Sequence, residues 1–167
     1  RRQRQMCIRD RRSAEYVYTV VQCYKEAIQA VQDGTFTEEK VKAWDERLAT
    51  VFNRGFWDGY YQGRKLGEWT DKNGSSATEK KEYVAKGTKY FSKLGVAEFL
   101  VEAGEINLGD KLVVIGPTTG VVYIDVTSMH GDNGPVEKAT KGMSVAFPVS
   151  EKVRPSDKLY KLVKTGN

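Results

Sequence analysis

The chain of 167 residues is poor in the side chains that most enzyme sites use. It has two cysteines, Cys7 and Cys23, and a single histidine, His130. The cysteines lack the paired spacing of a disulfide framework or a metal site, so a reducing, cytoplasmic location is expected. His130 has Asp132 nearby but no nucleophile beside it, and a solvated hairpin histidine is the expected alternative. The sequence therefore predicts neither a catalytic residue nor a metal or other cofactor within this chain.

Long apolar runs are absent as well. None approaches the roughly 20 residues that a membrane helix needs, so no membrane partner is expected. The net charge of +5 arises within residues 1–12, which hold six arginines and one aspartate. We expect residues 1–12 to be a non-native basic segment, the alternative being an arm that grips phosphates.

Residues 13–52 have the pattern of two amphipathic helices. Ser13 is placed to cap the first helix, whose apolar positions recur every three or four residues up to Val31, and Gly34 follows where a helix commonly ends. The second helix is expected to start at Thr37 and to end at the turn that begins with Asn53. Two helices alone bury such apolar stripes poorly, so they are expected to pack on a further surface.

Residues 53–80 form a connector rich in glycine, arginine and aromatic side chains. Glycine at this density indicates backbone with positive φ or close approach to a neighbour. Arginine beside aromatic side chains is typical of surfaces that stack on bases or dock on a partner. The residues predicted to bind substrate or to dock are Asn53, Arg54, Gly55, Phe56, Trp57, Gly59 and Arg64.

Residues 81–167 have the pattern of short strands separated by turns. The expected strands span 82–91, 96–102, 111–116, 120–126, 136–139, 144–149 and 158–163. Many short strands at this spacing are typical of a small closed or partly closed barrel. The fold class predicted for the chain is α+β, with helices followed by a small β-barrel.

Three stretches resemble peptidase family U32, the collagenase-like peptidases. The run from Arg12 to Val21, continued by residues 24–28, resembles the last helix of that family's catalytic domain. Asn53-Arg54-Gly55-Phe56 and Gly59 resemble its Asn-Arg-Gly segment. The C-terminal part is similar to the family's β-barrel, which is akin to the second domain of elongation factor Tu. The matching positions there are Leu108-Gly109-Asp110, Ile115-Gly116-Pro117, Gly120, residues 136–139 and Gly142.

The resemblance implies that residues 13–52 are the end of a TIM-like catalytic domain. The rest of that domain would lie outside this chain. That domain would be a partner, and in tRNA-modifying members it would carry an iron–sulfur cluster. Members are peptidases or hydroxylate the wobble uridine of tRNA at carbon 5. The function predicted here is an accessory C-terminal region that assists tRNA binding. Alternatives are the C-terminal domain of a collagenase-like peptidase with a polypeptide substrate, and a purely structural domain docked on the catalytic barrel.

Overall fold

The structure is a computed structural model that describes residues 12–51, residue 53 and residues 76–165. The chain divides into two compact units, one of residues 1–80 with 164–167 and one of residues 81–163. Each unit is described by itself. The basic segment 1–12 predicted from the sequence lies, except for Arg12, outside the described residues.

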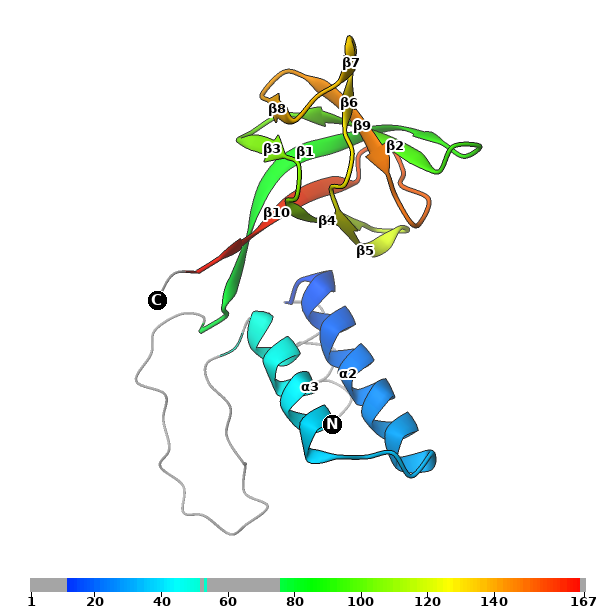
Figure 1. The fold of residues 1–167 in the computed structure, drawn as a ribbon, viewed down its shortest axis with the longest axis vertical. Helices are drawn as coiled ribbons and strands as arrows, with labels where there is room; N and C mark the ends of the chain where they lie inside the picture. The colour runs from blue at the N-terminus through cyan, green and yellow to red at the C-terminus, as the bar shows by residue number, and fades with distance from the viewer. Residues whose placement is uncertain (1–11, 52, 54–75, 166–167) are drawn as a thin grey trace. The chain divides into compact units, whose positions relative to one another are not determined.

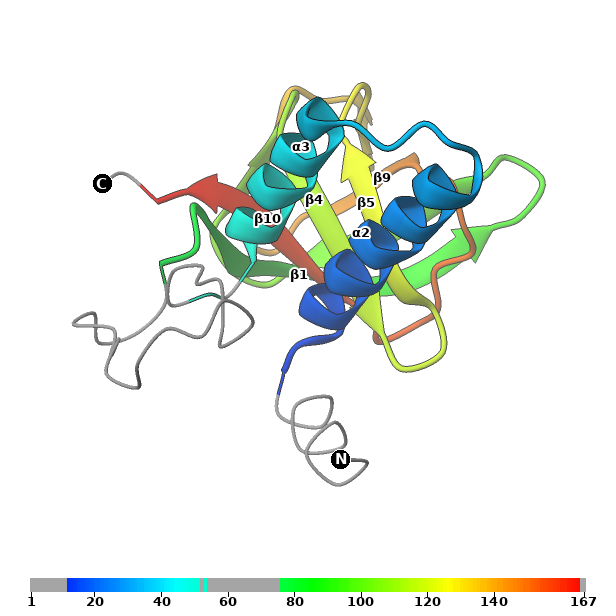
Figure 2. The ribbon, with the colours of Figure 1, turned by 90° about the horizontal axis from the view of Figure 1, so that it is seen from below.

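The first unit contains an antiparallel helical hairpin, in which α2 (Ala14–Gln32) lies beside α3 (Glu38–Thr50) (Figure 1, Figure 2). Ser13 precedes α2 as predicted, but its side chain makes no capping hydrogen bond. Gly34 has a φ of +66°, the left-handed conformation that glycine adopts without strain. Thr37 is the N-cap of α3, where its hydroxyl accepts a hydrogen bond from the Lys40 amide at 3.4 Å.

The second unit is a mostly antiparallel sheet in the order β5-β4-β10-β1-β2-β9-β6-β7, with a separate pair β3-β8 (Figure 1). The longer strands are β1 (Glu79–Phe91), β2 (Val96–Val101), β4 (Lys111–Gly116), β5 (Gly120–Asp125), β9 (Ser144–Pro148) and β10 (Lys158–Lys164). The shorter ones are β3 (Glu105–Asn107), β6 (His130–Gly131), β7 (Gly134–Pro135) and β8 (Lys138–Thr140). Two hairpins, β1-β2 and β4-β5, therefore supply most of the strand length of the sheet.

The core of the second unit is a cluster of buried apolar side chains contributed by most of its strands. Phe99 on β2 stacks on Phe147 on β9 with ring centroids 4.8 Å apart, and both rings are almost fully buried. Leu112, Val114 and Leu159 add aliphatic side chains from β4 and β10. Burying each of these side chains stabilises the fold by about 1.5–3 kcal/mol, so this cluster is the main source of the unit's stability.

A buried carboxylate joins the β4-β5 turn to the turn before β10. Asp157 is 3 % exposed. Its Oδ2 accepts hydrogen bonds from Thr119 Oγ1 at 2.5 Å and from the Arg154 amide at 2.8 Å. Gly116 lies against this carboxylate, and a Cβ there would be 1.9 Å from Asp157 Oδ1. A side chain at position 116 and the bonded carboxylate are thus mutually exclusive.

The two helices and the mostly antiparallel sheet agree with the predicted α+β class. The observed sheet has two ends, β5 and β7, and no pairing joins them among residues 76–165, so closure into a barrel is not found. The strand expected at 136–139 is shifted to β8, because Val136 and Glu137 belong to the turn that follows β7. The sequence pattern also missed β3, β6 and β7, which are too short for a repeating apolar pattern.

Among the described residues, no helix is long and apolar enough to cross a membrane. The same residues hold no group of three or more histidine, cysteine, aspartate or glutamate side chains placed to bind a metal ion.

Candidate functional site

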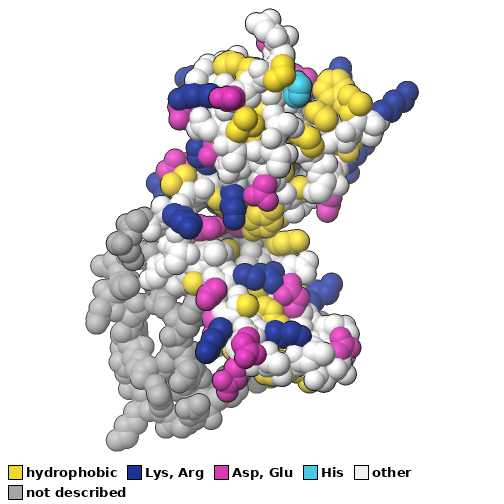
Figure 3. All heavy atoms as spheres, in the orientation of Figure 1, with side chains coloured by type: hydrophobic (Ala, Val, Ile, Leu, Met, Phe, Trp, Pro, Cys, Tyr) yellow, Lys and Arg dark blue, Asp and Glu magenta, His cyan; other side chains and the backbone are white. Residues whose placement is uncertain are grey.

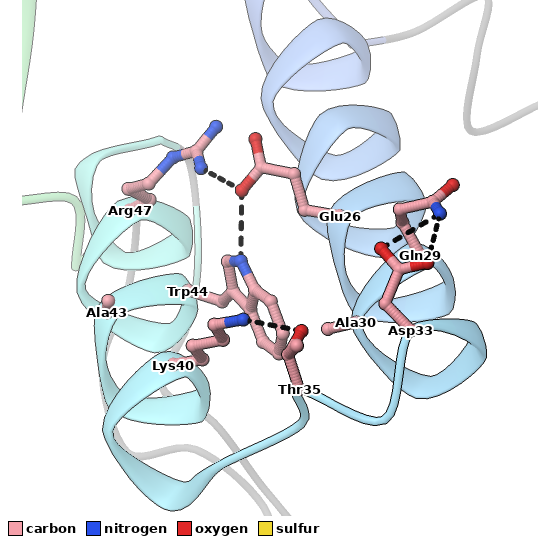
Figure 4. A pocket seen from close by; sticks show the side chains of 9 residues that line it. All are labelled: Glu26, Gln29, Ala30, Asp33, Thr35, Lys40, Ala43, Trp44 and Arg47. Carbon is pink, nitrogen blue, oxygen red and sulfur yellow. Dashed lines mark hydrogen bonds and ion pairs between the residues drawn. The ribbon is translucent and has the colours of Figure 1, made fainter.

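The α2–α3 hairpin has a polar face on which the two helices bond to each other (Figure 4). Glu26 Oε2 on α2 accepts a hydrogen bond from Trp44 Nε1 at 3.0 Å and pairs with Arg47 at 2.6 Å. Lys40 Nζ donates to Thr35 Oγ1 at 2.8 Å. These groups line an open hollow of about 380 Å³. The polar groups around the hollow are thus largely engaged with each other.

The ion pair shifts the titration of both partners. The hydrogen bond from Arg47 lowers the pKa of Glu26, and burial opposes it only in part. The same bond raises the pKa of Arg47. Both side chains are 44 % exposed, so solvent screens the pair and it stabilises the hairpin by at most about 1 kcal/mol. A carboxylate held ionised by such a partner is a structural element and a poor general acid.

The other side of the hairpin is apolar and open to solvent. On α2, the large apolar side chains at successive three- and four-residue steps are 48–65 % exposed. They are Val21, Tyr24, Ile28 and Val31. Phe36 in the interhelical loop is 50 % exposed. We call these five residues the apolar face. Soluble proteins rarely leave such a continuous apolar stripe uncovered, so this face is a candidate docking surface.

A second hollow, of about 210 Å³, opens beside the apolar face, between α2 and α3. Its lining is Cys23, Tyr24, Ala27, Phe36, Val41, Trp44, Asp45 and Leu48. Cys23 is 3 % exposed, and burial raises the pKa of its thiol, so it remains a protonated apolar group. Asp45 is the only charged residue of this lining. The hollow therefore combines an apolar interior with one carboxylate.

Of the seven residues predicted to bind substrate or to dock, Asn53 is the one that the structure describes. Its Nδ2 donates to the carbonyl oxygens of Ala49 at 3.1 Å and Val51 at 3.0 Å, which closes the end of α3. Its own carbonyl accepts from the Ser76 amide at 2.7 Å. Asn53 and Ser76, the described residues on either side of residues 54–75, are thus joined by a backbone hydrogen bond.

The other six residues predicted to bind substrate or to dock lie outside the described residues. They are Arg54, Gly55, Phe56, Trp57, Gly59 and Arg64. Their role in substrate binding or docking stays a prediction. The bonds of Asn53 to the end of α3 favour a structural role for that residue.

The β unit is close to neutral in net charge. Residues 81–163 hold eleven basic and ten acidic side chains, a net charge of +1. Basic and acidic side chains are interspersed on the face seen in Figure 3. His130 on β6 is exposed, and its strand pairs with β7 and β9, as expected for a solvated hairpin histidine.

One tyrosine of the β unit has a strongly shifted titration. The hydroxyl of Tyr83 on β1 donates to a carboxylate oxygen of Glu102, and its ring packs edge-on to Tyr160 at 5.7 Å. Burial and this hydrogen bond raise the pKa of Tyr83 to about 12. The phenol is thus a stable hydrogen-bond donor and a poor proton acceptor at neutral pH.

The sequence interpretation identified the stripe on α2 and expected it to pack on a further surface. It missed the hollow and Asp45, because only the pairing of the two helices brings Ala27 of α2 near Asp45 of α3. A charged residue on an otherwise apolar side of α3 was the available signal.

Comparison with known proteins gives the context of these features. The model of peptidase family U32 matches residues 10–71. Two collagenases of Porphyromonas gingivalis, one of them from strain W83, are 60 % and 61 % identical over 153 residues; these matches cover 92 % of this chain and 42 % and 37 % of the relatives. An uncharacterized protease of Methanocaldococcus jannaschii is 30 % identical over 158 residues, which cover 92 % of this chain and 38 % of that protein.

The chain thus spans about two fifths of the length of the curated relatives it matches. A solved structure, the C-terminal domain of a U32 peptidase of Geobacillus thermoleovorans, is similar with a TM-score of 0.46 and 18 % identity, covering 48 % of this chain and 91 % of that domain. The family match and the relatives at 60 % and 61 % identity agree with the resemblance stated above: residues 10–71 match peptidase family U32, and the chain is similar to proteins named collagenases.

Proposed function

We propose that this chain is the C-terminal accessory region of a longer collagenase-like peptidase of family U32, attached to its catalytic part by the apolar face of the hairpin. The observation that carries the proposal is the exposure of four large apolar side chains in one stripe of α2. A helix of this kind gains its stability from tertiary packing of its apolar side, so a covering surface is expected.

The names of the relatives support a polypeptide substrate. Two relatives that are 60 % identical or more are called collagenases, and this chain matches about two fifths of each. Among the described residues, no group of histidine, cysteine, aspartate or glutamate side chains is placed to bind a metal ion. In this proposal, the catalytic residues of the peptidase and an iron–sulfur cluster belong to the catalytic domain that the family resemblance implies outside this chain.

Assistance of tRNA binding is a second candidate function. The sequence of the connector favours it, because Arg54 and Arg64 alternate with aromatic side chains that could stack on bases. The near-zero net charge of the β unit does not support tRNA binding, since nucleic-acid affinity comes mainly from neutralisation of phosphates by basic side chains. Closure of the β unit into a barrel like the second domain of elongation factor Tu, and a cytoplasmic location, also remain proposals.

The test compares two variants of the longer protein in gelatin cleavage. Ile28→Lys places a charge in the apolar face, and we expect it to lower cleavage severalfold and to expose the hairpin to limited proteolysis. Gln29→Lys is the matched control, because that side chain lies on the polar side and a lysine there can still pair with Asp33. Equal behaviour of the two variants would contradict the proposed docking.

Titration of the same protein with tRNA at two salt concentrations separates the two functions. Absence of binding together with gelatin cleavage supports the peptidase. Binding whose affinity falls steeply with salt, without gelatin cleavage, supports the tRNA role instead.

A further inference from the structure

The hollow between α2 and α3 has the size and lining of a socket for one side chain. We propose that it receives a large apolar side chain from a helix of the catalytic part of the longer protein, and that this helix carries Lys or Arg within one turn of the inserted residue. The inference rests on the proposed function and adds what the docking partner must look like.

The volume and lining of the hollow argue for an apolar insert. A cavity of about 150 Å³ lined by aliphatic and aromatic residues accommodates a benzene ring. The hollow here holds about 210 Å³ and is lined by Ala27, Val41, Leu48 and the rings of Phe36 and Trp44. A leucine, methionine or phenylalanine side chain therefore fits, as anchors do in helix-in-groove recognition.

The carboxylate at the hollow argues for a neighbouring cation. Asp45 is exposed, and no ion pair or hydrogen bond joins its side chain to another of the described residues. Covering an apolar hollow desolvates a carboxylate at its edge, which is costly unless a cation pairs with it. A partner helix brings such a cation next to its apolar anchor at a spacing of three or four residues.

The length of the relatives favours the catalytic part of the same protein as the source of the inserted side chain. The aligned region makes up 37–42 % of each collagenase, so most of such a protein lies outside this chain and is available to cover the hairpin. A second copy of the chain is the competing occupant, and the experiment separates the two.

The experiment places the photo-crosslinking amino acid benzoylphenylalanine at Tyr24 of the longer protein. Tyr24 is 65 % exposed and stands at the edge of the hollow, so the replacement disturbs little of the hairpin. Crosslinked peptides are identified by mass spectrometry after irradiation. We expect an intramolecular crosslink to a predicted helix outside residues 12–167, at or beside a large apolar residue with Lys or Arg three or four positions away.

Two pairs of variants test the socket. Ala27→Phe fills the hollow, and we expect it to reduce the crosslink about tenfold, the effect of overpacking a tight contact. Ala43→Phe enlarges an alanine of the polar hollow by the same amount and should leave the crosslink unchanged. Asp45→Lys should reduce it severalfold, whereas Glu46→Lys, the same charge change one residue away, should not.

Each other outcome overturns the inference. One such outcome is a crosslink within the same molecule to the catalytic part, at a site without an apolar anchor and a cation. Another is a crosslink that Ala27→Phe does not reduce. Either result overturns the socket but leaves the proposed docking intact. A crosslink between two copies, a crosslink to the β unit, or no crosslink overturns both. Circular dichroism of Ala27→Phe, compared with Ala43→Phe, shows that the hairpin is still folded when the crosslink is lost.

Discussion

The contact between Gly116 and Asp157 allows a sharp prediction about the stability of the β unit. In Gly116→Ala, the new methyl group would lie 1.9 Å from Oδ1, 2.4 Å from Cγ and 2.9 Å from Oδ2 of Asp157. The φ of Gly116 is not in the positive region, so the backbone itself accepts alanine. The whole cost of the substitution therefore comes from displacing the carboxylate.

The magnitude follows from the bonds that the carboxylate loses. Asp157 accepts from Thr119 Oγ1 and from the Arg154 amide, and each hydrogen bond to a charged group is worth about 1.5–3 kcal/mol. We expect Gly116→Ala to lower the free energy of unfolding by about 3 kcal/mol, which corresponds to a fall in Tm of roughly 12–24 °C for a unit of this size.

A double-mutant cycle separates this cause from a general intolerance of alanine. Asp157→Ala alone should cost about 3 kcal/mol, because it removes the same bonds. Gly116→Ala added to it should cost less than about 1 kcal/mol, because the clash is gone, so the two effects couple by about 2 kcal/mol. Gly131→Ala is the matched control, since its Cβ would meet Val136 no closer than 3.4 Å.

The assay can follow the two units separately. All three tryptophans, Trp44, Trp57 and Trp69, precede residue 81, so tryptophan fluorescence reports on the first unit. Hydrogen-exchange protection of the strand amides, followed by mass spectrometry as the temperature rises, reports on the β unit. We expect Gly116→Ala to shift the second signal and not the first. A wild-type Tm in Gly116→Ala, or additive costs in the double variant, would refute the reasoning.

Three further predictions follow from the described contacts. Because the pKa of Glu26 is lowered in the folded state, its ion pair stabilises the hairpin at pH values above the ordinary glutamate pKa of about 4.3. This stabilisation is lost as the pH falls through the lower pKa of the folded state. Glu26→Gln should therefore lower Tm by a few degrees at pH 7 and not at pH 2. Tyr83 should ionise near pH 12 in a phenolate absorbance titration, and Glu102→Gln should lower that pKa; an unchanged titration curve would exclude the hydrogen bond as a cause. Replacing residues 54–75 by a short Gly-Ser turn should leave the Tm of both units within a few degrees of wild type, because a hydrogen bond already joins the flanking residues Asn53 and Ser76; a loss of cooperative unfolding would contradict this.

Local patterns in the sequence determined where most elements form. The helices of the hairpin follow from apolar residues at three- and four-residue spacing together with the caps at Thr37 and Gly34, which are local properties of the chain. The six longer strands follow from β-branched and aromatic runs bounded by turn residues. The resemblance to family U32 was equally a property of local motifs.

Tertiary structure alone decided which surfaces stay open and which side chains meet. The stripe on α2 has the same pattern whether it is buried or exposed, and its exposure depends on what packs against it. The hollow exists because α3 brings Val41, Asp45 and Leu48 beside Ala27 of α2. Likewise, Gly116 and Asp157 are far apart in sequence, and only the pairing of β4 with β10 brings the turn that contains Asp157 onto this glycine. Contacts between residues far apart in sequence produce no repeating pattern in a single sequence. The hollow and the Gly116–Asp157 contact therefore could not be predicted without the tertiary structure.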